Sequence, residues 1–497
     1  MTAAAGYRQQ GHNAEEQEGE GAEEVPGLHS LRRDFEHKPA GRLNHGSFGA
    51  TPVSVLQRQR HYQQRWAERP DEMFFRGELF ADLRLASASC IPLITSSDKV
   101  LPQQVALIEN ACAATAMIAH RWSKLISPGD VVFVLDCVYG ACRMCLQEHC
   151  CNDPRIGGQL CTLSIFEEHG SFPKSPAVIV ERFRCSLQKQ IRRIGQAVKD
   201  DGHTLDKHRP ARSHCKLFFF LDYVSSQPAF VLPVAEMLRG IGVVLSTNLP
   251  AEQSEAQLSL GEICIDAAHA FAVEGLDVVQ QFEGLPCELR PHWWFANLHK
   301  WAFAPPTATV VYAKTPELMS ETSHPMISWF YGKGLREECL WAGTRDYSSL
   351  LCVPAAARFL QTWRSPDGLG PPAFSKARIL EAGKYLSALW GTSDNLPDPE
   401  LVCALMMVEL PRELDVGAQD LPGLPTADTK ERRSVRTILR DDFNVEAAVG
   451  SFGPSGNFIR LSYAVYNTWD DILSLGHGVM QILQAQQSLN AKQEAEG

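Results

Sequence analysis

The chain has 497 residues, with 47 lysines and arginines against 58 aspartates and glutamates, and therefore a formal net charge of −11. Hydrophobic residues make up 44% and charged residues 21%. These fractions are typical of a globular protein with a large core and exclude a disordered chain, a collagen and a coiled coil. The net acidity argues against a nucleic-acid partner. No apolar run approaches the ~20 residues that a membrane helix needs, so we expect no membrane partner.

The N-terminal segment 1–28 is rich in glutamate and glycine. It lacks the basic start and the apolar stretch of a secretory signal, so we predict a disordered acidic tail. The chain contains 15 cysteines, an odd number. An odd count without a secretory signal favours a reducing compartment, and we predict a cytoplasmic protein.

Apolar runs of strand length alternate with helical patterns through the first two thirds of the chain. The Gly-rich stretch 43–52 is predicted as a loop, and the Ala-rich stretch 105–126 as one buried helix. Two further helices are predicted at 54–66 and 78–94. Strands are predicted at 131–136, 216–221, 241–245, 262–265 and 308–312. Alternation of this kind indicates an α/β domain with a mostly parallel sheet.

Two polar segments, 151–215 and 246–261, are predicted to be surface insertions in this large domain, which we place at 29–345. Near residue 346 the pattern changes, and 346–497 is predicted to form a smaller α+β domain. Its expected helices are 350–363, 375–390 and 469–486, and its expected strands are 401–410 and 456–463. Thr468 and Asp471 form a capping box before the last helix.

Lys300 is the most informative single residue of the sequence. Aromatic and apolar residues flank it, and partial desolvation disfavours the ammonium form and makes the amine a nucleophile. Asp266 ends a predicted strand upstream. A lysine and a carboxylate of this kind suit a Schiff base to pyridoxal 5′-phosphate (PLP), in which the carboxylate keeps the pyridine nitrogen protonated. These residues alone are also compatible with a second interpretation, in which Lys300 is a surface lysine beside an aromatic cluster.

Several motifs in a fixed order carry a resemblance to a known family. They are LNHGSFG (43–49), ENACAAT (109–115), VYGA (138–141), D-x-x-H (266–269), NLHKW (297–301), WAGTRD (341–346) and IRLSYAVYN (459–467). Together they resemble the class V aminotransferase family of fold-type I PLP enzymes, over about residues 40–485. Within that family they resemble the isopenicillin N epimerase-like subgroup, which includes hercynylcysteine sulfoxide lyases and related C–S lyases. The resemblance implies a large domain with a mostly parallel sheet and a smaller α+β C-terminal domain.

The resemblance implies roles for five residues around the cofactor ring. Lys300 would bind PLP covalently and later move the proton at the substrate Cα. Asp266 would pair with the pyridine nitrogen, and His269 would lie near the phenolic oxygen. Tyr139 would stack on the ring face, and Ser225 would lie near the ring oxygen.

The cofactor phosphate would lie at a helix start. Asn110, Ala111 and Cys112 would open a helix whose free N–H groups bind the anion. Asn297 and His299 would also reach the phosphate. Cys112 stands where a hydroxyl residue is common, which removes one phosphate contact.

The remaining implied roles concern the substrate and a second subunit. Arg460 would bind the substrate carboxylate as a fork. Asn44 and His45 would line the substrate mouth. Thr344 would reach the phosphate of the neighbouring subunit's cofactor, which implies a homodimer with shared active sites.

With these parts the sequence favours a PLP-dependent lyase that removes a β-sulfur group from a cysteine-derived amino acid. An epimerase or racemase and a class V aminotransferase use the same parts and stay open, as does a non-catalytic binding protein on the same fold. A cysteine desulfurase needs a nucleophilic cysteine on a mobile loop of the small domain. The cysteines after Lys300 are Cys339, Cys352 and Cys403, two of them in apolar elements, which argues against that chemistry.

No metal site is predicted. Cys137, Cys142 and Cys145 match the C-x4-C-x2-C spacing of plant-type iron–sulfur proteins, with Cys150 or Cys151 as a fourth ligand. However, Cys137 ends a predicted strand and the others share a helix face, whereas such ligands sit on a loop that wraps the cluster. A second group lies in a basic polar segment that we interpret as a solvated loop: His203, His208, His214 and Cys215.

Overall fold

A seven-stranded sheet with the order β1-β7-β6-β5-β4-β2-β3 lies at the centre of the structure. The structure is a computed structural model that describes residues 34–35, 41–166, 172–203, 214–248, 257–417, 433–451 and 456–496. Its strands are β1 (Val105–Ile108), β2 (Val131–Leu135), β3 (Gln159–Leu163), β4 (His214–Asp222), β5 (Gln257–Asp266), β6 (Trp293–Asn297) and β7 (Thr309–Ala313). Only β7 of these strands is antiparallel to its neighbours. The predicted mostly parallel sheet is confirmed, and the predicted acidic tail lies outside the described residues.

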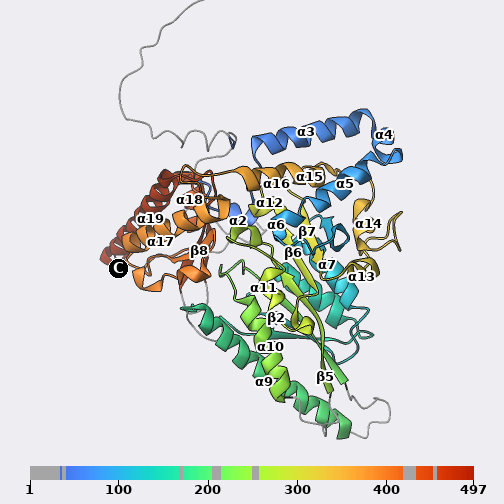
Figure 1. Ribbon diagram of the computed structural model, residues 1–497. Helices are drawn as coiled ribbons and strands as arrows, with labels where there is room; N and C mark the ends of the chain where they lie inside the picture. The colour runs from blue at the N-terminus through green and yellow to red at the C-terminus, as the bar shows by residue number, and fades with distance from the viewer. Residues whose placement is uncertain are drawn as a thin grey trace, which may run out of the picture.

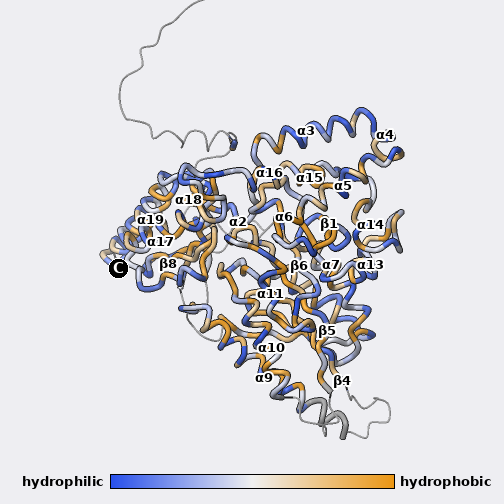
Figure 2. Tube along the Cα trace, in the orientation of Figure 1, coloured by the Kyte–Doolittle hydropathy of each residue, from blue (hydrophilic) through white to orange (hydrophobic). Residues whose placement is uncertain are grey.

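Both faces of the sheet are buried, which explains why its strands are continuous apolar runs. Along β4, Phe219 belongs to one apolar cluster, and Phe218 and Phe220 belong to the other. Helices α9 (Pro176–His203) and α10 (Val234–Asn248) pack together on the first face (Figure 1). Helices α7 (Ala111–Trp122), α8 (Gly140–Leu146), α13 (Pro316–Glu321) and α14 (Leu335–Leu340) cover the second. Apolar segments gather inside and hydrophilic ones outside, as along α3 (Figure 2).

A second, three-stranded antiparallel sheet has the order β8-β10-β9. Its strands are β8 (Leu405–Glu409), β9 (Ala448–Ser451) and β10 (Asn457–Ser462). Helices α17 (Pro371–Trp390), α18 (Val435–Phe443) and α19 (Trp469–Glu496) gather beside it at one side of the molecule (Figure 1). The backbone N–H of Thr468 donates to Asp471 Oδ2 at 3.0 Å, which forms one half of the predicted capping box.

The N-terminal helices cover the edge of the large sheet near β1. They are α3 (Val53–Glu68), α4 (Pro70–Phe75), α5 (Glu78–Ala88) and α6 (Ile91–Ile94), and they pack with α15 (Ser348–Leu351) and α16 (Val353–Thr362). The predicted helices 78–94 and 350–363 are thus each divided in two. Two further short helices are α11 (Gln280–Glu283) and α12 (Leu298–Trp301).

The short helix α2 (His45–Phe48) lies inside the predicted loop 43–52 and joins the two sheets. The Leu43 backbone accepts from Ser462 N–H of β10 at 3.0 Å. Gly49, with a φ of 68°, closes the helix, and a Cβ there would lie 1.8 Å from the His299 carbonyl oxygen. Only glycine permits this approach of α2 to the chain around Lys300.

Two predicted elements are wrong. The stretch 105–126 is not one helix, because its first four residues form β1, paired with β7, and Asn110 then caps α7 by accepting from Ala113 N–H at 2.9 Å. The predicted strand 241–245 belongs to α10, where Ile241 and Val244 continue a buried helical stripe.

Segment 151–215 is not a surface insertion, because it contributes the edge strand β3 and the long helix α9. In segment 246–261, the first residues end α10 and β5 begins at Gln257, so this strand is longer than predicted.

Candidate active site

The predicted site residues of the large domain follow the carboxyl ends of parallel strands, where α/β proteins bind their ligands. Asn110 follows β1, Tyr139 follows β2, and Ser225 follows β4. Asp266 is the last residue of β5, and Lys300 follows β6 on α12. The topology therefore brings residues from five different strands to one edge of the sheet.

Lys300 lies partly buried at the centre of this edge. Its Nζ is 3.3 Å from His269 Nε2. Burial, followed by the Arg460 charge, lowers the pKa of Lys300 to about 8, although Asp266 opposes this shift. The amine is therefore neutral in a substantial fraction of molecules near neutral pH, as a nucleophile requires.

His269 is held between Lys300 and Trp301. The Trp301 indole N–H donates to His269 Nδ1 at 3.3 Å, so this nitrogen carries no proton. Burial, with the nearby Lys300 charge, lowers the pKa of His269 well below its usual value. The neutral ring therefore presents its proton at Nε2, toward Lys300.

Asp266 is 4% exposed and forms no ion pair with a described residue. Its Oδ1 accepts from Ala268 N–H at 3.0 Å, and its Oδ2 accepts from the Cys142 thiol at 3.6 Å. Burial raises the pKa of this carboxyl, and the two donors and the Lys300 charge oppose the rise. A buried carboxylate without a cation in contact fits a protonated pyridine nitrogen.

The start of α7 lies beside Asn297. The Ala111 N–H donates to Asn297 Oδ1 at 3.0 Å, and Thr309 donates to the same oxygen at 2.7 Å. The Cys112 amide lies in the first turn, where backbone N–H groups have no intrahelical acceptor. His299 Nδ1 contacts the Ala308 carbonyl at 3.0 Å, and burial lowers the pKa of this histidine to about 4. A helix start of this kind suits a phosphate.

Arg460, on β10, is buried and brings a guanidinium from the second sheet into the site. Its Nη1 donates to Ser226 Oγ at 2.9 Å and to the Ser226 carbonyl at 3.1 Å. Its Nη2 donates to Asn44 Oδ1 at 3.0 Å and to Ser47 Oγ at 2.6 Å. Its Nε has no hydrogen-bond partner within the described part of the chain. Neutral groups thus orient the Arg460 guanidinium, which pairs with no described carboxylate. A guanidinium held in this way suits the carboxylate of an incoming substrate.

Four predicted residues lie at the margin of this constellation. Tyr139 is 54% exposed, and Thr344 is exposed in the turn after α14. Ser225 is buried within its own turn, where its Oγ donates to the Pro228 carbonyl at 2.5 Å. His45 is fully buried, with Nε2 at 2.8 Å from the Lys300 carbonyl, and therefore lies behind the lysine and not at a surface.

Sequence reasoning missed several contacts of the site. Ser226 and Ser47 hold Arg460, Trp301 holds His269, and Cys142 contacts Asp266. Ser47 and Trp301 lie inside recognised motifs, and Ser226 and Cys142 directly follow predicted site residues or motifs, but only the folded geometry shows that their side chains point inward.

The cysteine groups weighed as metal ligands are spread over separate elements. Cys137 follows β2, Cys142 and Cys145 lie on α8, and Cys150 and Cys151 lie on the π-helical turn η2 (Gln147–Asn152). Within the described residues, no three His, Cys, Asp or Glu side chains are grouped to hold a metal ion. His208 lies outside these residues.

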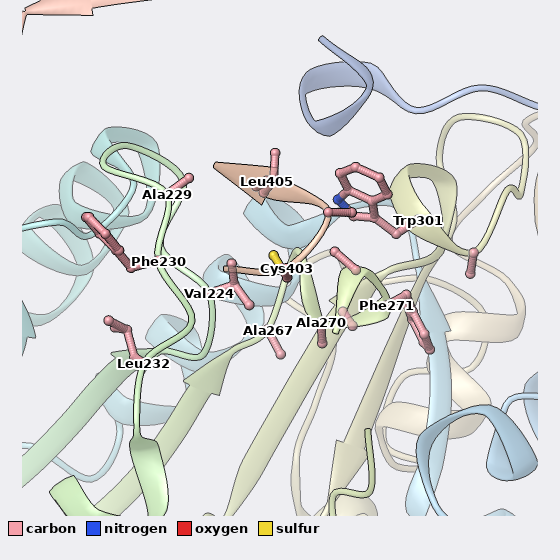
Figure 3. Packing of buried hydrophobic residues seen from close by; sticks show 14 of the residues in the cluster. Val224, Ala229, Phe230, Leu232, Ala267, Ala270, Phe271, Trp301, Cys403 and Leu405 are labelled. Carbon is pink, nitrogen blue, oxygen red and sulfur yellow. The ribbon is translucent and has the colours of Figure 1, made fainter. Parts of the chain in front are cut away.

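The apolar core continues from the site into the second sheet. Trp301 lies beside Leu405 of β8 in the apolar cluster that the two sheets share (Figure 3). The site thus rests on a cluster shared by both sheets, which fixes Arg460 relative to Lys300.

Known proteins share this chain's length and fold. No family model matches the chain. An L-cysteine desulfhydrase of Arabidopsis thaliana is 29% identical over 476 residues, which cover 91% of this chain and 90% of that protein. A putative L-cysteine desulfhydrase of Oryza sativa subsp. japonica is also 29% identical, over 91% of this chain and 86% of that protein.

Solved structures of similar fold include a cysteine desulfurase from Thermococcus onnurineus NA1, with a TM-score of 0.61 at 13% identity, covering 93% of this chain and 99% of that one. They also include the cystine C–S lyase C-DES in complex with cysteine persulfide, with a TM-score of 0.57 at 14% identity, covering 88% of this chain and 96% of that one. The predicted fold, that of fold-type I PLP enzymes with a mostly parallel large sheet, is therefore confirmed.

Among the described residues, no helix combines the length and the apolar character needed to cross a membrane.

Proposed function

We propose that this protein is a PLP-dependent C–S lyase that converts L-cysteine and water to pyruvate, ammonia and hydrogen sulfide. The observation that carries the proposal is the convergence of Lys300, Asp266 and Arg460 at the carboxyl edge of the large sheet. The names of the two plant relatives, both L-cysteine desulfhydrases, support the choice of substrate.

The donor set of the site fits PLP. Lys300 supplies a partly neutral amine for the cofactor aldehyde, Asp266 a buried carboxylate for the pyridine nitrogen, and the first turn of α7 the Cys112 amide for the phosphate. When bound, PLP supplies an electron sink for the electrons left at the substrate Cα.

The chain's own groups divide the remaining work. Arg460 binds the substrate carboxylate and fixes its orientation. Lys300 takes the proton from Cα and stands ready to protonate the departing sulfur. His269, which is neutral with its proton on Nε2, donates toward the phenolic oxygen without adding charge to the pocket.

The three thiols that follow Lys300 in the chain support release of sulfide over its transfer to the protein. Sulfur transfer needs an accessible thiolate near the substrate. Cys339, Cys352 and Cys403 are all buried. Burial raises the pKa of Cys403 to about 11, so this thiol stays protonated at neutral pH.

We further infer a homodimer in which Thr344 of one subunit reaches the cofactor phosphate of the other. Thr344 is exposed in the single chain, and the nearby segment exposes Ile327 and Trp329. Light scattering should give twice the chain mass. Mixing the inactive variants Lys300→Ala and Thr344→Ala should restore part of the activity, because hybrid dimers contain one intact site; no recovery would contradict shared sites.

The narrower assignments are also proposals. The ordered motifs favour the isopenicillin N epimerase-like subgroup of the class V family. All 15 cysteines are free thiols, which supports a reducing compartment such as the cytoplasm. Imaging of the full chain with a fluorescent tag would test the compartment.

The test of the main proposal is product analysis with L-cysteine and added PLP in heavy water. We expect sulfide and pyruvate in equal amounts, and a fall of about 100-fold or more in Lys300→Ala, because proton transfer contributes about that much. Alanine with a protein persulfide would indicate a desulfurase. Recovered cysteine with deuterium at Cα but no pyruvate would indicate an epimerase or an aminotransferase. Visible cofactor absorbance without any product would indicate a binding protein.

A further inference from the structure

The hydrogen bonds of Arg460 leave one of its N–H groups without an acceptor. The two terminal nitrogens carry four N–H bonds, and four acceptors face them. These are Ser226 Oγ and the Ser226 carbonyl at Nη1, and Asn44 Oδ1 and Ser47 Oγ at Nη2. The remaining donor, Nε–H, is buried and has no acceptor among the described residues. An unpaired buried donor is costly, so this side chain of a residue that is only 6% exposed is directed at an incoming acceptor.

The unpaired Nε–H decides how a carboxylate can bind to this guanidinium. A guanidinium has two edges that can bind both carboxylate oxygens: an end-on edge formed by Nη1 and Nη2, and a side-on edge formed by Nε and Nη2. Both nitrogens of the end-on edge already have acceptors, whereas on the side-on edge only Nη2 has acceptors within the described chain. A carboxylate on the side-on edge therefore displaces one acceptor and satisfies the buried Nε–H.

The acceptors of Nη1 are held in place by the turn after β4. One of them is a backbone atom, the Ser226 carbonyl oxygen. The preceding residue, Ser225, is fully buried, and its N–H donates to the Phe230 carbonyl at 3.0 Å. One residue earlier, Val224 forms a β-bridge with Val231. Because these contacts fix the turn, we expect Nη1 to keep its acceptors when a substrate binds.

The acceptors of Nη2 belong to α2 and are held less firmly. Asn44 is the N-cap of this helix and is 5% exposed. Ser47 is partly exposed and contacts Nη2 through its hydroxyl alone, at 2.6 Å. The Ser47 hydroxyl proton is donated to Asn44 Oδ1 at 2.8 Å. Rotation about one side-chain bond is therefore enough to withdraw Ser47 Oγ from Nη2, while Asn44 stays in place.

We propose that the Ser47 hydroxyl competes with the substrate carboxylate for Nη2 of Arg460, and that the carboxylate displaces it and binds across Nε and Nη2. The inference rests on the proposed function, which makes the ligand an amino acid. Ser47 is a positioning residue in this arrangement, because it acts on the guanidinium and leaves when the substrate binds. It keeps the cation oriented before binding, and this contact lowers the affinity for the substrate.

The size of the effect follows from the hydrogen bond that is exchanged. Ser47→Ala removes an acceptor from Nη2 before the substrate arrives and removes nothing afterwards. The net contribution of one hydrogen bond corresponds to about threefold to tenfold in an equilibrium constant. Ser47→Ala should therefore bind a carboxylate more tightly by about that factor. Ser226→Ala removes an acceptor that is present before and after binding, so it should bind the carboxylate no more tightly than wild type.

The experiment measures the binding of 3-(methylthio)propionate to the full chain loaded with PLP. This probe has the carboxylate, carbon chain and sulfur of a cysteine derivative, but it has no amino group and therefore cannot join the cofactor or be cleaved. Isothermal titration calorimetry gives its Kd for wild type, Ser47→Ala and Ser226→Ala. Ser246→Ala, which removes an exposed hydroxyl on α10, is the control for the loss of a hydroxyl elsewhere. Steady-state kinetics give KM and kcat for L-cysteine.

We expect Ser47→Ala to bind the probe about threefold to tenfold more tightly than wild type, and its KM for L-cysteine to fall by more than its kcat changes. Ser226→Ala and Ser246→Ala should bind the probe no more tightly than wild type. Unchanged or weaker binding by Ser47→Ala, or an equal gain in Ser226→Ala, would overturn the proposal. Failure of the proposed function would look different, because wild type would then release no sulfide from L-cysteine, whatever the order of the affinities.

Discussion

Trp301→Phe tests whether the indole N–H controls the proton of His269. The variant keeps an aromatic ring in the core but removes the donor that lies 3.3 Å from His269 Nδ1. This nitrogen is buried, so it loses its partner without gaining water. An unsatisfied buried acceptor costs about 1–3 kcal/mol. Without the indole donor, the tautomer with its proton on Nε2 loses its preference, and the other tautomer, which places a bare lone pair at Nε2, becomes populated.

The tautomer change has two measurable consequences. A lone pair at Nε2 faces Lys300 Nζ and stabilises the ammonium form, so the pKa of the lysine should rise above about 8. The same lone pair opposes the phenolic oxygen of PLP, so turnover of L-cysteine should fall. A loss of 1–3 kcal/mol corresponds to about 5- to 160-fold in kcat.

Trp294→Phe is the matched control. Trp294 is also a buried tryptophan of the same region, but its Nε1 has no hydrogen-bond partner among the residues that the structure describes. Both variants remove the same atoms and create similar cavities, so the part of the stability loss that comes from the cavity should be alike. Sulfide release and the pH dependence of PLP absorbance should change only in Trp301→Phe. Equal effects of the two variants on turnover would refute the tautomer argument.

Three further outcomes follow from the structure. The rate at which the protein without cofactor combines with PLP should rise with pH with a midpoint near pH 8, because half of the Lys300 amines are neutral at their lowered pKa of about 8. Stopped-flow absorbance measures this rate, and a midpoint near pH 10 would contradict the lowered pKa. Glu262→Ala should lower the free energy of unfolding by about 3 kcal/mol, because it leaves the partly buried Arg121, whose Nη2 lies 2.6 Å from Glu262 Oε1, without its carboxylate. Urea denaturation measures this change, and a loss under about 1 kcal/mol would contradict it. Arg460→Lys should raise the KM for L-cysteine by about 10-fold or more with a smaller effect on kcat, because an ammonium cannot bind a carboxylate with two parallel hydrogen bonds. Steady-state kinetics, with Ser226→Ala for comparison, would show whether binding of the substrate carboxylate needs the two parallel hydrogen bonds of the guanidinium.

The sequence predicted the large sheet because both of its faces are buried, and burial on both faces leaves continuous apolar runs. The same signal failed at 241–245, where a buried helix also presents a short apolar run. It failed again at 105–108, where strand β1 directly precedes an Ala-rich helix and the two merge into one apolar stretch. In both cases, contacts with a distant part of the chain, such as the pairing of β1 with β7, decide between helix and strand. The composition of a short stretch of sequence does not reveal these contacts.

The roles of Lys300, Asp266 and Arg460 stay predictions, yet the geometry explains why a motif pattern finds them and misses their partners. Each stands on a strand or at its end, and its fixed distance from the apolar run of that strand makes it recognisable in the sequence. Ser226, Ser47 and Cys142 have no such mark, because serine and cysteine side chains are common in turns and cores. Only the approach of α2, the loop after β4 and α8 to the same edge of the sheet selects them.

The site depends on both sheets, and α2 is the element that couples them. His45 contacts the Lys300 carbonyl at 2.8 Å, and its neighbour Asn44 accepts from Arg460 at 3.0 Å. Lys300 and Arg460, the proposed catalytic lysine and carboxylate-binding arginine, are thus tied through the first residue of α2 and its N-cap. A displacement of β10 relative to β6 would break these contacts and the shared apolar cluster around Trp301 and Leu405 together. The separation of the two cations is therefore set by the packing between the sheets, which ties the dimensions of an acceptable amino acid to the stability of that interface.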